Sequence, residues 1–115
     1  MTDELWDLMS ETTEVRRLAD ALRLSDLAGT TAPDQEREYL LRRAAVDQRH
    51  LVLFPDDEKG IAEAQRSAVM LRDHDAVHAS HQGAVPAAAP QWVSLDGAGD
   101  YVRQEAAAAG LAGQD

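Results

Sequence analysis

Three of the four histidines of the chain lie close together, at His74, His78 and His81 in the stretch DHDAVHASHQ. On an α-helix, residues three and four positions apart lie on the same face, so these imidazoles form a stripe. Two imidazoles at i and i+4 can chelate zinc, nickel or copper. The first and the third are about 10 Å apart along the helix axis, so one ion cannot take all three. The stripe therefore predicts a divalent-metal site formed by His74 with His78, or by His78 with His81.

A two-histidine site needs carboxylates or water as its remaining ligands. Pro55 is expected to end one helix just before the histidine-bearing helix begins, and two helices with so short a connection pack as an antiparallel hairpin. At a rise of about 1.5 Å per residue, this hairpin brings Glu36 level with His74 and Asp34 level with His78. Glu36 and Asp34 are therefore the expected carboxylate neighbours of the stripe.

The fourth histidine, His50, ends a tetrad DQRH that is similar to the tetrad DAVH ending at His78. Di-iron helical bundles use two carboxylate–x–x–histidine motifs on facing helices. In the predicted hairpin, however, His50 lies near the turn, about 27 Å along the axis from His78. The two tetrads are therefore not expected to share a metal site.

Two other interpretations of the stripe need no metal. Histidines near the end of a helix favour the negative end of its dipole, and Asp73 and Asp75 around His74 would then form a solvated ion-pair cluster. Alternatively, the stripe is a pH-sensitive contact, because imidazole changes its charge near neutral pH. The sequence leaves all three interpretations open.

Apolar residues at helical spacing predict three long helices that position these side chains. The first covers about residues 3–27. The second begins at the capping sequence TAPD, residues 31–34, and ends at Pro55. The third begins at Asp56 and is expected to end at Gly83. Their short connections make neighbouring helices antiparallel, which indicates a small antiparallel three-helix bundle.

The composition of the chain changes after Gly83. The segment GAVPAAAPQW is small, proline-bearing and nearly uncharged, as expected for an extended linker. Trp92 and Tyr101 are large aromatic side chains in this region, and they either dock on the open end of the core or contribute an interaction site for a partner. The predicted fold is all-α, with a three-helix core over residues 1–83, a C-terminal extended arm over 84–95, and a short helix with a frayed tail over 96–115.

Charge and composition exclude several classes of function. The 115 residues carry a formal net charge of −10 and include no cysteine. A nucleic-acid or anionic-membrane surface needs clustered cations, so neither partner is expected. Disulfides and thiolate metal sites are excluded. The N-terminus MTDELWDL lacks the features of a signal peptide, and no apolar run approaches the roughly 20 residues of a membrane span, so a cytoplasmic protein is expected.

The chain shows no nucleophile elbow, cofactor fingerprint or phosphate-binding loop. We therefore expect a non-enzymatic protein-interaction or regulatory module that binds a protein partner or a second copy of itself. The alternative is a metal-binding protein that holds a divalent transition metal, such as zinc or nickel, on the histidine stripe. A third possibility is a small enzyme or ligand carrier with an apolar pocket beneath Trp92.

Overall fold

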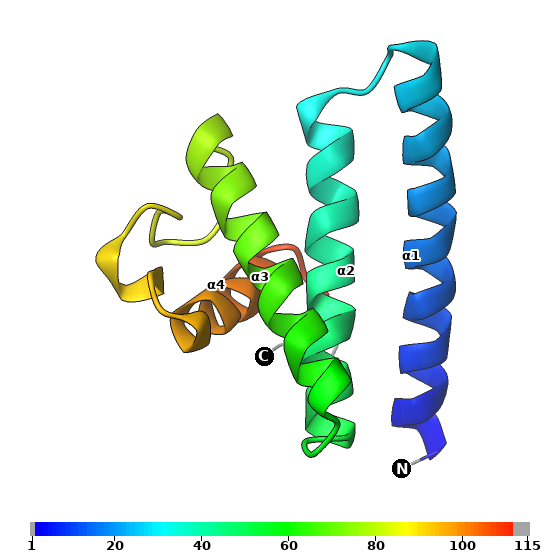
Figure 1. Cartoon of the computed structure of the whole chain (residues 1–115), viewed down its shortest axis with the longest axis vertical. Coiled ribbons are helices and arrows are strands. Elements are labelled where there is room, and N and C mark those ends of the chain that lie inside the picture. The colour runs from blue at the N-terminus through cyan, green and yellow to red at the C-terminus, as the bar shows by residue number, and fades with distance from the viewer. Residues whose placement is uncertain (1, 112–115) are drawn as a thin grey trace.

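The computed structural model describes residues 2–111, which form four α-helices and one 3₁₀ turn (Figure 1). The elements are α1 (Thr2–Ala28), α2 (Pro33–Leu53), α3 (Glu58–His78), the turn η1 (Pro90–Trp92) and α4 (Leu95–Ala108). This range contains no strand, so the all-α prediction is confirmed. None of its helices is long and apolar enough to cross a membrane.

The boundaries of α2 follow from its sequence. Pro33 occupies the first turn, where its missing N–H costs no hydrogen bond, and Asp34 and Glu36 lie at the positive end of the helix dipole. The helix ends at Leu53, because Pro55 cannot continue it. These are the limits that the sequence indicates.

The end of α3 differs from the prediction. The helix stops at His78, and Ala79 takes up a left-handed conformation with φ of 51°, so the helix does not continue to Gly83. The cause lies in Asp75, whose carbonyl accepts the Ser80 N–H at 3.1 Å and whose carboxylate accepts the Ser80 hydroxyl at 2.7 Å. These two bonds stabilise a chain reversal that places His81 in a loop.

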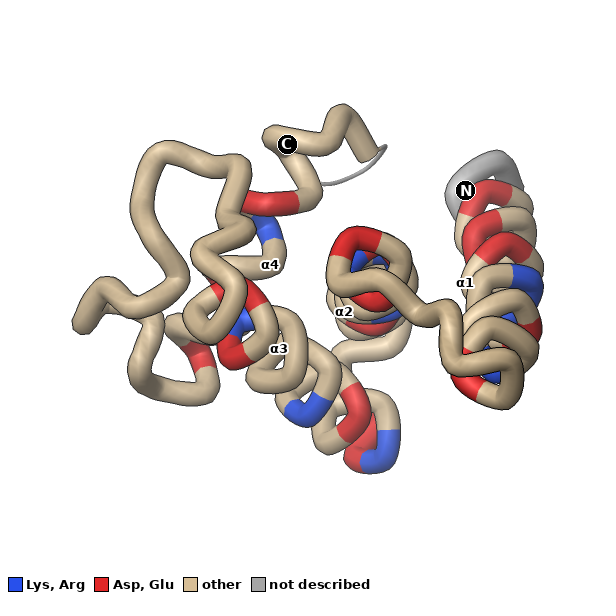
Figure 2. Tube along the Cα trace, turned by 90° about the horizontal axis from the view of Figure 1, so that it is seen from above, with Lys and Arg blue, Asp and Glu red and all other residues tan. Residues whose placement is uncertain are grey.

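Helix α2 lies at the centre of the arrangement (Figure 2). Helix α1 packs along one side of it, where Arg49 of α2 pairs with Glu11 and the Gln35 amide donates to the Ser25 hydroxyl at 2.8 Å. Helix α3 crosses the other side, and α4 packs against both α2 and α3. Consecutive long helices run antiparallel, as the short connections predict.

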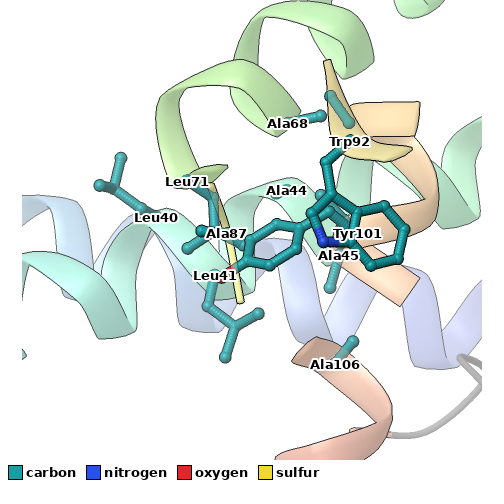
Figure 3. Packing of buried hydrophobic residues seen from close by; sticks show 12 residues of the cluster. Leu40, Leu41, Ala44, Ala45, Ala68, Leu71, Ala87, Trp92, Tyr101 and Ala106 are labelled. Atoms are coloured by element: carbon teal, nitrogen blue, oxygen red, sulfur yellow. The ribbon is translucent and has the colours of Figure 1, made fainter. Parts of the chain in front are cut away.

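The hydrophobic core lies between α2, α3 and α4 (Figure 3). Its buried cluster consists of Leu40, Leu41, Ala44, Ala45, Ala68, Leu71, Ala87, Trp92, Ala98, Tyr101, Val102 and Ala106. Half of these residues follow Gly83, and none belongs to α1. The expectation of a core formed by the first three helices is therefore corrected, because α4 is part of the core and α1 flanks it.

Small residues allow α4 to approach its neighbours closely. Ala98 and Ala106 are fully buried on the face that packs on α2 and α3. At the start of the helix, the Ser94 hydroxyl caps the N–H of Gly97 at 2.9 Å, and a Cβ on Gly97 would lie only 2.4 Å from the carbonyl oxygen of Gln91. A side chain at position 97 would therefore push the start of α4 away from Gln91.

Candidate functional site

An open groove of about 560 Å³ lies against α2, between the second half of α1 and the end of α3. It forms because α1 and α3 both pack on α2 but lie on different sides of it (Figure 2). Five of the lining side chains are apolar or aromatic, namely Leu22, Tyr39, Leu40, Met70 and Val77. The polar lining residues are Glu36, Asp73, His74 and His78. Two histidines of the stripe, His74 and His78, therefore line this groove.

The polar wall of the groove is built around His74. Its Nδ1 lies 2.9 Å from Oε1 of Glu36, which confirms that the hairpin brings these two residues level. The imidazole is almost fully buried, and the ring of His78 packs on it with centroids 4.4 Å apart. The other ring nitrogen, Nε2, is also buried and has no hydrogen-bond partner among residues 2–111.

The contact with Glu36 assigns the tautomer of a neutral His74. Nδ1 carries the proton and donates it to the carboxylate, so Nε2 is left as a hydrogen-bond acceptor. A buried acceptor without a partner is unfavourable, and a donor or a cation at that position would stabilise it. The carboxylate–histidine pair is also the arrangement that orients metal-binding imidazoles. In this wall, Nε2 of His74 is therefore a buried acceptor without a partner, and His78 is the exposed histidine.

The structure brings only part of the predicted metal set together. His81 lies in the loop after α3 and does not line the groove, and Asp34 lines a separate depression near Arg37. His50 lies at the opposite end of α2, where its Nε2 contacts Asp57 at 2.9 Å. Across the described part of the chain, no group of three or more His, Asp and Glu side chains is placed to hold one ion. Of the predicted metal ligands, only His74 and His78 lie together, and Glu36 contacts Nδ1 of His74.

A second polar cluster lies in the core, and the sequence did not predict it. Arg37 of α2 donates from Nε to Asp75 of α3 at 2.7 Å and from Nη2 to Glu105 of α4 at 2.7 Å. Tyr101 donates its hydroxyl proton to Asp75 at 2.5 Å. Asp75, Glu105 and Tyr101 are fully buried. The expectation that Asp75 lies in a solvated ion-pair cluster is therefore wrong. Its carboxylate is buried between α2, α3 and α4, where it accepts hydrogen bonds from Arg37 and Tyr101.

The two buried carboxylates also hold the loop after α3. Glu105 accepts the backbone N–H groups of Gln82 and Gly83 at 2.5 and 2.8 Å, and Asp75 accepts the Ser80 hydroxyl. The pattern of buried polar groups that satisfy one another is typical of a structural network. We name Arg37, Asp75, Tyr101 and Glu105 the buried ionic cluster.

The ionisation states in the buried ionic cluster are fixed by its contacts. Burial would raise the pKa of Asp75, but the hydrogen bonds from Arg37, Tyr101 and Ser80 outweigh it and lower that pKa below its ordinary value. Burial and the Asp75 carboxylate raise the pKa of Tyr101 far above its ordinary value. Asp75 is therefore ionised and Tyr101 protonated at neutral pH, and neither is poised to exchange a proton with a substrate.

The C-terminal aromatics take the first of the two arrangements expected for them. Trp92 and Tyr101 are buried and pack edge to face with centroids 5.6 Å apart (Figure 3). The indole N–H of Trp92 donates to the carbonyl of Pro86 at 3.0 Å. In this structure the two rings occupy the space beneath the arm and are not available as a surface for a partner.

Comparison of the chain with protein-family models, with curated proteins and with solved structures finds no match. The groove and the buried ionic cluster are therefore the observations from which function can be inferred.

Proposed function

We propose that the protein is a non-enzymatic interaction module that binds a basic amphipathic helix of a partner protein in the groove against α2. The observation that carries this proposal is the apolar lining of the groove. Met70 and Val77 leave large parts of their side chains exposed beside Leu22, Tyr39 and Leu40. Contiguous exposed apolar surface is typical of interaction sites, and a groove between helices suits the apolar face of another helix.

The charge around the groove favours a basic partner. Glu36 and Asp73 are the acidic side chains of the lining, and no lysine or arginine of the described part of the chain lines it. The whole chain carries a net charge of −10. Lysine or arginine residues that flank the apolar anchors of a bound helix would meet these carboxylates, which raises both specificity and association rate. The titratable groups of the buried ionic cluster bond one another, which supports a binding role over a catalytic one.

An arginine-flanked peptide tests this proposal. The probe is a 14-residue helical peptide with leucine at i, i+4 and i+7 and arginine on both flanks. We expect Val77→Arg to weaken its binding at least about tenfold, because the substitution removes apolar contact and adds a repulsive charge. Isothermal titration calorimetry measures the effect.

Val93→Arg is the matched control for this measurement. Val93 is 74% exposed and Val77 is 79% exposed, so both substitutions leave the core intact, but only Val77 lines the groove. The control should bind the peptide as the unmodified chain does. Equal weakening by both substitutions, or equally tight binding of a peptide with glutamate in place of arginine, would contradict the proposal.

A second candidate function is the binding of a divalent transition metal by His74 and His78. The contact of Glu36 with His74 Nδ1 favours it, because this contact orients the imidazole and leaves Nε2 without a partner, and the ring of His78 packs on the same imidazole. Zinc titration by calorimetry should then show binding tighter than about 0.1 mM, which His78→Ala abolishes. His50→Ala, at the far end of α2, is the control and should change nothing. Weaker binding, or equal loss in both variants, would exclude this function.

A further inference from the structure

The groove against α2 lies between side chains of opposite charge. On α2, the lining residue Glu36 is followed seven positions later by Arg43. On α3, the lining residue Asp73 is preceded seven positions earlier by Arg66. Seven residues are close to two helical turns, so each pair lies on one face of its helix, about 10 Å apart along the axis. Because α2 and α3 run antiparallel, both carboxylates lie at one end of the groove and both arginines at the other (Figure 1).

The acidic end of the groove lies where α2 begins and α3 ends. Oε1 of Glu36 is 2.9 Å from Nδ1 of His74, the residue after Asp73, so the two carboxylates are at the same level. Arg72 contacts Asp73 at 3.1 Å, but the Arg72 side chain is only 19% exposed, whereas that of Asp73 is 63% exposed. The charge that this end presents to a bound molecule is therefore mainly negative.

The basic end lies one turn beyond Tyr39, which lines the groove. Arg43 donates to the Tyr39 hydroxyl at 3.0 Å, and Glu63 joins the two arginines, at 3.1 Å from Arg43 and 3.5 Å from Arg66. Asp47 lies 4.0 Å from Arg43. The side chains of Glu63 and Asp47 are 33% and 22% exposed, whereas that of Arg66 is 65% exposed. Arg66 is therefore the most accessible charge at this end.

These charges distinguish the two ends of a bound helix, which carries a partial positive charge at its N-terminus and a partial negative charge at its C-terminus. We propose that the partner helix lies parallel to α2. Its N-terminal end and its basic residues lie beside Glu36 and Asp73, and its C-terminal end and its acidic residues lie beside Arg66. A helix of 14 residues is about 21 Å long, enough to reach both ends. The inference rests on the proposed helix-binding function and adds the direction and the charge order of the partner.

Two isomeric peptides test the direction. Both are 14-residue helices with leucine at i, i+4 and i+7, and a hydrocarbon staple on the solvent face gives them equal helix content. The first has arginine at its N-terminal flank and glutamate at its C-terminal flank, and the second has the two flanks exchanged. Their net charges are equal, so the long-range attraction to the acidic chain cancels. Calorimetry should show at least about threefold tighter binding of the first, because only the first matches both the flanking charges and the helix dipole.

Arg66→Glu tests the basic end of the groove. It should weaken binding of the first peptide at least about fivefold, because the glutamates of the peptide then meet a carboxylate, and it should strengthen binding of the peptide with arginine on both flanks. Arg103→Glu is the matched control, because Arg103 is also exposed and also follows its acidic partner by three residues. Arg103 lies on α4 and does not line the groove, so its replacement should leave the ratio of the two affinities unchanged.

A nitroxide label on the first peptide locates its two ends directly. A label at the N-terminus should broaden the amide signals of Val77 and His78, and a label at the C-terminus should broaden those of Glu63 and Arg66. The opposite pattern, equal affinities of the two isomers, or an unchanged affinity ratio in Arg66→Glu would overturn the inference while the groove still binds a helix. Absence of binding by every arginine-bearing peptide would instead overturn the proposed function, and this inference with it.

Discussion

Replacement of Arg37 by leucine is expected to lower the free energy of unfolding by about 3–5 kcal/mol. It removes the one cation among residues 2–111 that contacts both buried carboxylates of the buried ionic cluster. Asp75 and Glu105 would then face each other across the core without a compensating charge. One of them must take up a proton or open the core to water, and either change destabilises the fold. Urea unfolding at neutral pH, followed by circular dichroism, measures the loss.

Arg42→Leu on the same helix is the matched control for Arg37→Leu. Arg42 is half exposed and lies 3.6 Å from Glu38, one turn away, and such pairs contribute less than about 0.5 kcal/mol.

The loss of stability in Arg37→Leu should also depend on pH. Without the hydrogen bonds from Arg37, burial raises the folded-state pKa of Asp75, so the stability of the variant falls as pH increases. The difference from the unmodified chain should therefore narrow between pH 7 and pH 4. Similar losses in both variants would show that Arg37 has no special role.

Replacement of Trp92 by alanine is expected to cost about 3–5 kcal/mol, the usual loss for a large buried aromatic side chain. Trp92 is only 7% exposed, packs on Tyr101, and donates its indole N–H to Pro86. Its backbone carbonyl also accepts a hydrogen bond from Arg72 of α3 at 2.9 Å. The alanine variant should therefore release the segment between α3 and α4 from the core. Urea unfolding gives the cost, and proteolysis between residues 84 and 94 reports the release.

Trp6 is the control for Trp92, because it is 60% exposed. Trp6→Ala should change the free energy of unfolding by less than about 0.5 kcal/mol, as most surface substitutions do. If Trp92→Ala were as stable as Trp6→Ala, the segment could not be an integral part of the core.

The features of the fold that local sequence controls could be predicted. The position of Pro33 and Pro55 sets the limits of α2, and apolar spacing indicates the long helices. The contact between Glu36 and His74 follows from an antiparallel hairpin and the rise per residue alone. These predictions succeed because each depends on one helix or on two consecutive helices.

The end of α3 could not be predicted, because the chain reversal after it depends in part on a residue of α4. Glu105 of α4 accepts the N–H groups of Gln82 and Gly83, and buried Asp75 anchors Ser80. These hydrogen bonds stabilise a chain reversal directly after His78, which the local sequence does not require. His81 therefore does not share a helix face with His74 and His78, because the predicted stripe required a helix that continued to Gly83.

The sequence places each charged residue of the buried ionic cluster one turn from a buried apolar residue, but this spacing can be interpreted only once the packing of α4 is known. Arg37 is four residues before Leu41, and Asp75 is four residues after Leu71, so each extends a buried apolar stripe by one turn. Glu105 stands in the same relation to Tyr101. A charged residue at a stripe position more often marks the edge of the buried face than its centre. Only the arrangement of the three helices shows that the three charges meet.

The most direct test of the helix-binding groove is a titration of the ¹⁵N-labelled protein with the arginine-flanked peptide, monitored by the backbone amide signals. The largest shifts should fall on Met70, His74 and Val77, which line the groove, while the signal of Val93 stays unchanged. The glutamate-flanked peptide should cause much smaller shifts. Shifts that concentrate outside the groove, or that are equal for the two peptides, would contradict the proposal that this groove binds a basic amphipathic helix.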